Sequence, residues 1–280
     1  MTFKAGLVQM RTGVDEARNL ADATQLIREA AAQGADFIIT PEITNLFEPD
    51  RPKFREKITP PDDNISIKGF SALAKELNRW LHIGSLVLKV GDGMAVNRAL
   101  LFAPDGKIAA TYDKVHLYDV DLPNGDTYRE SAVYQGGKEA VVVDLPFCKL
   151  GVSICYDVRF PLLYHALAQA GANVLVTPAA FTVPTGQAHW HVLQRARAIE
   201  TGSFVLTAAQ GGKHEGGRET YGHSLVVNPW GEIIAEIKGD EPGVLMAKID
   251  VAQSVDARAR IPALANTRSF TLKREKALAT

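Results

Sequence analysis

The chain has 280 residues, of which 46% are hydrophobic and 22% charged, as in ordinary globular proteins. Its formal net charge of −1 gives no electrostatic reason to expect nucleic acid or an anionic membrane as a partner. No signal-peptide pattern opens the sequence, no apolar run approaches the roughly 20 residues of a membrane span, and two cysteines are too few for a disulfide framework. We therefore expect a cytoplasmic protein in which at least one thiol is free for chemistry.

In the first half of the chain, short apolar runs alternate with helical patterns. The runs "FKAGLVQM", "GADFIITPE" and "HIGSLVLKV" are predicted as strands, and the patterns at 17–33 and 70–80 between them as helices. Residues 44–65, rich in proline and charge, are predicted as an exposed loop. The run "RALLFAPDGKIAA" at 98–110 is typical of a hairpin, and a long irregular segment follows at 112–137.

The second half repeats this order. Strand patterns "CKLGVSIC", "GANVLVTPA" and "SFVLTAAQ" alternate with helical patterns at 161–170 and 191–202, and "HSLVVNPWGEIIA" matches the first hairpin. Each half has one sheet face left after its helices cover the other, and packing sheet on sheet buries both. We therefore predict an α/β fold with four αββα layers over residues 1–250 as one domain. Residues 251–280 are predicted as a C-terminal extension that crosses to a partner subunit.

Cys155 ends an apolar run and is followed abruptly by Tyr156, Asp157 and Arg159. A cysteine at a strand-to-helix turn is held rigidly, and the N–H groups that follow it can bind an oxyanion. A catalytic nucleophile is therefore one interpretation of Cys155, and a small buried apolar residue is the other. Cys148 fits the second interpretation better.

Glu42 follows a proline at the end of the strand "FIIT", comparable to the position of Cys155 in the other half. Strand ends are where ligands gather in open α/β sheets, so the two side chains are expected to meet near the junction of the halves. The alternative for Glu42 is a structural ion pair. Lys114 lies in the long irregular segment. Considered without the other residues, it is interpreted as a surface lysine.

Two further patterns carry weaker signals. The histidines of "AHWH", His189 and His191, suggest a metal site, but alternation on one helix splays their side chains apart, and no metal is predicted. The run "GGKHEGG" at 211–217 lacks the ending of a phosphate-binding loop and is predicted as a mobile loop.

The motifs "TPE" around Glu42, "DKVHL" around Lys114 and "ICYDVRFP" around Cys155 together resemble the nitrilase superfamily of carbon–nitrogen hydrolases. The resemblance extends over nearly the whole chain and implies the same αββα sandwich. It implies a catalytic triad of Glu42, Lys114 and Cys155, with Glu130 of "YRES" supporting the lysine. No metal or organic cofactor is implied.

The resemblance also implies a mechanism. Glu42 takes the thiol proton, Cys155 attacks the amide carbon, and Lys114 with the backbone N–H of Tyr156 stabilises the oxyanion. A thioester forms and is then hydrolysed.

Four segments, "HLYDVD", "CYDVRFP", "TGQAHWHVLQRARAIE" and "AAQGGKH", are most similar to the deaminated glutathione amidase branch, with omega-amidases, which act on α-ketoglutaramate and α-ketosuccinamate, as close neighbours. Both kinds of substrate carry a carboxylate. Arg159 is a candidate clamp for that carboxylate, and the alternative is a salt bridge to Asp157 or another acid. Thr185 is a second candidate contact.

Three alternatives stay open at this point. The triad identifies the reaction class, but the sequence does not identify the acyl group of the substrate. Omega-amidase and true nitrilase activity are therefore alternatives to hydrolysis of deaminated glutathione. A non-catalytic binding protein on the same fold is a further alternative. The resemblance also suggests a homodimer or higher oligomer built through helices near 161–170 and 190–200.

Overall fold

The computed structural model describes residues 1–123 and 125–275, without the side chain of residue 92. One six-stranded sheet has the order β16-β1-β2-β3-β4-β5. β1, β2 and β3 pair in parallel, and the other pairings are antiparallel. The strands are β1 (Thr2–Gln9), β2 (Phe37–Ile39), β3 (Trp80–Lys89), β4 (Ala95–Phe102), β5 (Ile108–Asp113) and β16 (Gly243–Asp250).

The second six-stranded sheet has the order β15-β14-β11-β10-β9-β8. Its parallel strands β9, β10 and β11 take the places of β1, β2 and β3, and the hairpin of β14 and β15 takes the place of β4 and β5. The predicted internal repeat is therefore confirmed strand by strand. These strands are β8 (Val141–Asp144), β9 (Lys149–Val152), β10 (Val174–Val176), β11 (Phe204–Thr207), β14 (Leu225–Val227) and β15 (Ile233–Glu236).

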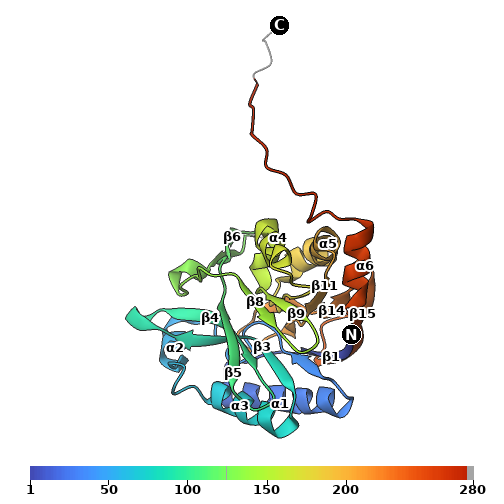
Figure 1. Ribbon diagram of the computed structural model, residues 1–280. Coiled ribbons are helices and arrows are strands. Elements are labelled where there is room, and N and C mark those ends of the chain that lie inside the picture. Colours follow the sequence, from blue (N-terminus) through green and yellow to red (C-terminus); the bar gives the residue numbers. More distant parts are fainter. Residues whose placement is uncertain (124, 276–280) are drawn as a thin grey trace.

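Helices cover the outer face of each sheet, which gives the predicted αββα layers (Figure 1). α1 (Glu16–Ala32) and α3 (Ile65–Leu77) pack on the first sheet, and α4 (Pro161–Gln169) and α5 (Val183–Thr201) pack on the second. Asp15 and Asn64 cap the starts of α1 and α3 by accepting backbone N–H bonds. The apolar stripe of α1, with Ala23, Ile27 and Ala30, faces its sheet.

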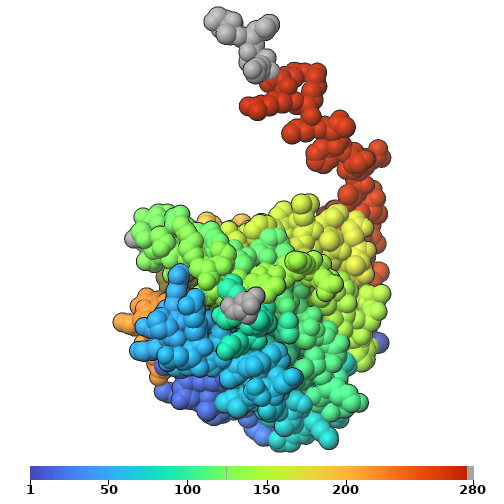
Figure 2. Space-filling model, turned by 90° about the vertical axis from the view of Figure 1, so that its left-hand side faces the viewer, coloured from blue at the N-terminus to red at the C-terminus, as the bar shows by residue number. Residues whose placement is uncertain are grey.

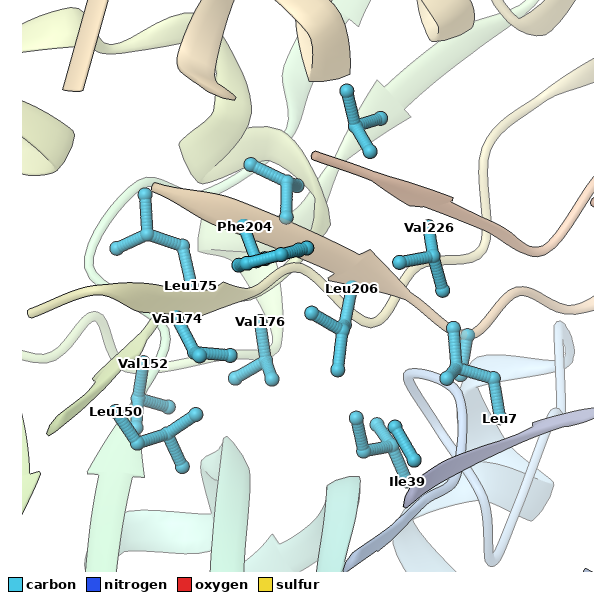
Figure 3. Close-up of a cluster of buried hydrophobic side chains, with 14 of the residues drawn as sticks. Leu7, Ile39, Leu150, Val152, Val174, Leu175, Val176, Phe204, Leu206 and Val226 are labelled. Atoms are coloured by element: carbon cyan, nitrogen blue, oxygen red, sulfur yellow. The ribbon is translucent and has the colours of Figure 1, made fainter. Parts of the chain in front are cut away.

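The inner faces of the two sheets meet in one apolar layer. Phe37 and Ile39 of β2 belong to this central cluster, whereas Ile38 between them belongs to the cluster under α1 and α3. This alternation is what the two-residue period of a strand requires when both faces are buried. Figure 3 shows Val174, Val176 and Leu206 of the second sheet on the side of Leu7 and Ile39 of the first. The strand ends of both halves are thereby held at one junction.

Two predicted loops turn out to be more ordered than expected. Residues 44–65 contain the helix α2 (Arg51–Lys57), and Leu46, Phe54 and Ile58 in this segment are buried in a third apolar cluster. Residues 211–217 begin a hairpin of β12 (Gly211–Lys213) and β13 (Glu219–Tyr221). His214 in that hairpin is buried and bonds through its ring to Thr12 and Thr220. Apolar and ring contacts with distant segments explain both differences.

Smaller elements lie between the strands of the two main sheets. β6 (Asp119–Asp121) and β7 (Thr127–Arg129) form a short hairpin. Short 3₁₀ helices lie at η1 (Gly91–Gly93), η2 (Glu130–Ala132) and η3 (Cys155–Arg159). The hairpin and η2 lie within the long segment predicted at 112–137, and η3 follows β9.

The last helix, α6 (Ala252–Arg260), packs on the second half through Arg258, whose guanidinium donates to backbone oxygens of Ala172 and Thr201. Residues 261–275 are mostly exposed. The first of them still contact α4, where Gln169 Nε2 donates to Leu264 O at 2.8 Å, and the chain then extends away from the body in Figures 1 and 2. Part of the predicted extension, residues 276–280, lies outside the described residues. Among the described helices, none is long and apolar enough to cross a membrane.

Candidate active site

Glu42 lies just beyond β2, in a turn that the neighbouring strand β3 shapes. β3 has an irregularity between Ile83 and Leu86, and there Gly84 lies against the backbone of the turn. A β-carbon on Gly84 would come within 2.2 Å of the Thr40 oxygen and 2.5 Å of the Pro41 oxygen, so only glycine permits this approach. Ser85 then accepts a hydrogen bond from the Ile43 N–H at 2.8 Å. Contacts with Gly84 before Glu42 and with Ser85 after it therefore hold the turn, and Glu42 is 2% exposed.

Lys114 follows β5 and is 1% exposed, so its interpretation as a surface lysine is wrong. Its N–H donates to Asn97 O and its carbonyl accepts from Gly137, which holds the backbone between two neighbouring segments. Its Nζ donates to Glu42 Oε1 at 2.8 Å and to both carboxylate oxygens of Glu130 at 3.0 and 2.9 Å. The ammonium thus bridges two glutamates from distant parts of the chain.

Cys155 stands three residues beyond β9, at the start of η3, with a φ of 47°. This left-handed conformation is unfavourable for a residue with a side chain and is concentrated at functional sites. The Cys155 N–H donates to Pro178 O at 2.9 Å, and the thiol hydrogen bonds to Glu42. The thiol therefore meets the carboxylate that already binds Lys114.

Asp157 holds the turn that follows the cysteine. Its fully buried carboxylate accepts from the N–H of Ile154 at 2.9 Å, the hydroxyl of Tyr112 at 2.7 Å and the N–H of His116 at 3.0 Å. A buried carboxylate needs such partners, and these donors come from two stretches of the chain, one around residues 112–116 and one at Ile154. Asp157 consequently has a positioning contact with the cysteine turn, and the expected alternative of a pair with Arg159 is wrong.

The charges around the thiol keep it protonated. Burial, together with the negative charge of Glu42 and its hydrogen bond, raises the pKa of Cys155 well above its ordinary value, and the opposing effect of Lys114 is smaller. Burial alone would lower the pKa of Lys114, but the charges of Glu130 and Glu42 raise it well above its ordinary value. The resting site thus holds a neutral thiol beside an ammonium and a carboxylate that can take its proton.

These groups line a cavity of about 160 Å³ at the junction of the halves. All seven predicted site residues line it: Glu42, Lys114, Glu130, Cys155, Tyr156, Arg159 and Thr185. The Arg159 guanidinium lies 5.4 Å from the centre of the Phe181 ring and donates to His189 Nδ1 at 3.2 Å. It forms no ion pair with a carboxylate in the described part of the chain, so its charge is available to a bound anion.

Sequence reasoning missed other residues of this site. Asn97 of β4 donates to Glu42 Oε1 at 2.8 Å, and the N–H of Ala180 donates to Glu42 Oε2 at 2.9 Å. A polar asparagine inside the apolar run "AVNRALLF" is the one signal that points to Asn97. Arg218, from the β12–β13 hairpin, also lines the cavity and lies over the rings of Phe47 and Tyr128.

An αββα sandwich whose cavity holds a thiol, a carboxylate and an ammonium has the architecture of hydrolases that cleave carbon–nitrogen bonds. Residues 4–259 match the family model described as carbon-nitrogen hydrolase. The chain therefore belongs to the carbon–nitrogen hydrolase family, and its reaction class is hydrolysis of amides.

Two curated relatives resemble the chain over nearly its full length. Omega-amidase NIT2 of Homo sapiens is 37% identical over 270 residues, which are 96% of this chain and 96% of the relative. A deaminated glutathione amidase of a Synechocystis species is 38% identical over 266 residues, covering 94% of this chain and 97% of the relative. The two branches expected from the sequence thus both appear.

Solved structures agree with the fold. The NitFhit protein of C. elegans has a TM-score of 0.88 and 33% identity, and the match covers 95% of this chain and 65% of that one. An amidase from a Nesterenkonia species, solved with acrylamide added to its active-site cysteine, has a TM-score of 0.77 and 27% identity, over 93% of this chain and 98% of that one.

Proposed function

We propose that the chain is an amidase for a small substrate that carries a carboxylate, with deaminated glutathione as the substrate. The observation that carries this proposal is the junction of Glu42, Lys114 and Cys155 at one cavity, beside Arg159, which forms no ion pair with any described residue. The thiol supplies the nucleophile and the carboxylate the base. Arg159 supplies a two-pronged cation for the substrate anion.

The proposed reaction uses these groups in sequence. Glu42 accepts the Cys155 proton as the sulfur attacks the amide carbon. Lys114 Nζ and the N–H of Tyr156 bind the oxyanion, and Glu42 returns the proton to the departing nitrogen as the C–N bond breaks. Water, deprotonated by Glu42, attacks the thioester, and the acid leaves while the thiol regains its proton. Glu130 holds the Lys114 ammonium in place throughout.

The substrate proposal rests on two arginines in one cavity. Deaminated glutathione has a carboxylate at its 2-oxo acid end and a second one at its glycine end, on either side of the scissile amide. Arg159, with Thr185 beside it, supports binding of the first. Arg218, which also forms no ion pair with a described residue, supports binding of the second.

Omega-amidase activity is the second candidate. It is favoured by the 37% identity to the human omega-amidase over 96% of both chains. α-Ketoglutaramate has a single carboxylate and releases ammonia, so it would engage Arg159 and leave Arg218 unused.

A substrate panel tests the proposal. The purified protein would be incubated with deaminated glutathione, α-ketoglutaramate, an aliphatic nitrile and an N-carbamoyl amino acid, and the carboxylic acid products measured. The expected order of kcat/KM places deaminated glutathione first and α-ketoglutaramate second. Preference for either of the last two substrates would contradict the amidase assignment. Activity that survives Cys155→Ala would contradict the mechanism.

We also propose a cytoplasmic homodimer in which α4 and α5 face a second copy. Leu162 of α4 is 83% exposed, and Val192 and Ile199 of α5 are 68% and 53% exposed, which is unusual for apolar side chains on two adjacent helices. We propose that residues 1–250 form the hydrolase domain and that residues 251–280 extend toward the partner. Its exposed residues 261–275 support that proposal.

A further inference from the structure

Three side chains with metal-binding atoms meet outside the active-site cavity, and none of them lines it. His191 comes from α5, His223 from the segment before β14, and Glu236 from the end of β15. Their ligand atoms all lie within 4.8 Å of one another. His191 Nε2 and His223 Nδ1 are each 2.9 Å from the same oxygen, Glu236 Oε1.

The spacing suits a tetrahedral ion. Zinc binds imidazole nitrogen and carboxylate oxygen at about 2.0–2.2 Å, which puts neighbouring ligand atoms about 3.3 Å apart in a tetrahedron. Two of the three separations here are within a few tenths of an ångström of that value. The side chains of His191, His223 and Glu236 are 30%, 23% and 18% exposed, which leaves an open side for a water ligand.

The backbone holds the three ligands in place. His223 adopts a left-handed φ of 57°, its N–H donates to Gly239 O at 2.9 Å, and its carbonyl accepts from Trp190 Nε1 at 2.9 Å. Its ring stacks on Tyr221 with centres 4.3 Å apart. This φ is unfavourable for a non-glycine residue, and the two backbone hydrogen bonds hold His223 in it. In this conformation the imidazole points toward Glu236. His189, two residues before His191, instead contacts Arg159.

The carboxylate is in the form that a cation needs. Burial alone would raise the pKa of Glu236, but the hydrogen bonds from His191 and His223 lower it below its usual range. Two imidazoles and a carboxylate form a donor set that suits zinc.

We propose that His191, His223 and Glu236 form a binding site for one divalent transition-metal ion, with zinc the best match and water as the remaining ligand. When the ion binds, the N–H protons that now bond to Glu236 Oε1 move to the other nitrogen of each ring. Protons compete with the ion for the same ligand atoms, so binding weakens as pH falls. It ties α5 to the β14–β15 hairpin. It takes no part in the amidase reaction.

Metal titration of the whole chain tests the site. Cys155→Ala serves as host so that the cavity thiol does not bind the metal, and Zn²⁺ is titrated by calorimetry at pH 7.5. We expect about one equivalent bound with a Kd of about 10 µM or tighter. Each of His191→Ala, His223→Ala and Glu236→Gln should weaken binding at least about tenfold. The matched control, His189→Ala on the same helix, should leave the Kd unchanged.

A second readout does not depend on the variants folding. Co²⁺ bound to the host should give the visible absorption of a four-coordinate site, and one equivalent of Zn²⁺ should remove it and raise Tm. The absence of binding at about 1 mM metal would overturn the proposal, and so would binding undiminished by the three variants. Either result would leave the three residues as a hydrogen-bonded cluster only.

Discussion

The chemistry of Cys155 is set by its burial and by the charges of Glu42 and Lys114 beside it. Burial and Glu42 raise the pKa of this thiol, so the resting nucleophile is neutral at neutral pH. Activation must therefore come from transfer of the proton to Glu42 during attack and not from a preformed thiolate. Burial raises the pKa of Cys148 to about 12, so the second cysteine is also a thiol.

Removing the negative charge of Glu42 should separate thiol acidity from catalysis. In Glu42→Gln the largest charge that raises the Cys155 pKa disappears while Lys114 remains, so the pKa falls. We expect faster alkylation of Cys155 by iodoacetamide at pH 8, read by mass spectrometry, together with a loss of about 10²–10⁴-fold in kcat. Cys148 should stay unlabelled in both proteins. Slower alkylation of the variant would contradict a neutral resting thiol.

Replacing Arg218 should change the kcat/KM for one of the two candidate substrates and leave the other nearly unchanged. Arg218→Gln removes a charged partner for the distal carboxylate of deaminated glutathione, worth about tenfold or more in kcat/KM. Hydrolysis of α-ketoglutaramate should stay within about twofold. An equal loss for both substrates would place Arg218 in general support of the cavity.

At the scale of elements, the position of Glu42 depends on the close contact between Gly84 of β3 and the turn after β2. Gly84→Ala would force a β-carbon against the Thr40 and Pro41 oxygens, and the turn must move. We expect a loss of about 1–3 kcal/mol in the free energy of unfolding and of about 100-fold in kcat, because small displacements of a catalytic group are costly. Gly91→Ala meets no atom within 4 Å and is the control. Unchanged kcat in Gly84→Ala would show that the turn tolerates the shift.

The sequence predicted the order of elements well because each half repeats the same hydrophobic pattern, and the period of that pattern is a local property. It failed at residues 44–65 and 211–217, where order comes from contacts with distant residues, such as the bonds of His214 to Thr12 and Thr220. The triad came from motifs, whereas Asn97 and the N–H of Ala180 acquire their contacts only when β4 and the segment after β10 lie beside Glu42. Likewise His223 and Glu236, which complete the cluster around His191, are 32 and 45 residues away from it.

At the scale of the whole molecule, one buried histidine makes stability depend on pH. Burial lowers the pKa of His82 in β3 to about 4, and neither of its ring nitrogens has a partner among the described residues. In the unfolded chain the His82 ring takes up a proton near pH 6.5, whereas in the folded chain it does so only near pH 4. The contribution of His82 to the free energy of unfolding is therefore fully present above about pH 6.5 and is lost as pH falls toward about 4. Between pH 7.5 and 5 the contribution is about 2 kcal/mol.

Replacing His82 should reduce the dependence of the free energy of unfolding on pH. In His82→Leu the free energy of unfolding, from urea titrations, should fall about 2 kcal/mol less between pH 7.5 and 5 than in the unchanged chain. His189→Gln, at an exposed position on α5, should leave the pH dependence unaltered. Equal slopes for all three proteins would mean that His82 is charged or hydrated in the folded chain.

Association of two copies through α4 and α5 would cover the apolar side chains that these helices leave exposed. Paired Leu162→Glu and Val192→Glu changes bring four like charges into such an interface, where they have no partners. Sedimentation velocity at micromolar concentration should then show a dimer for the unchanged chain and a monomer for the double variant. Ile65→Glu, a 45% exposed apolar position on α3, should leave the dimer intact. Because the cavity is built within one chain, the monomer should keep its cysteine-dependent amidase activity, and a dimer that survives the double change would move the interface to another surface.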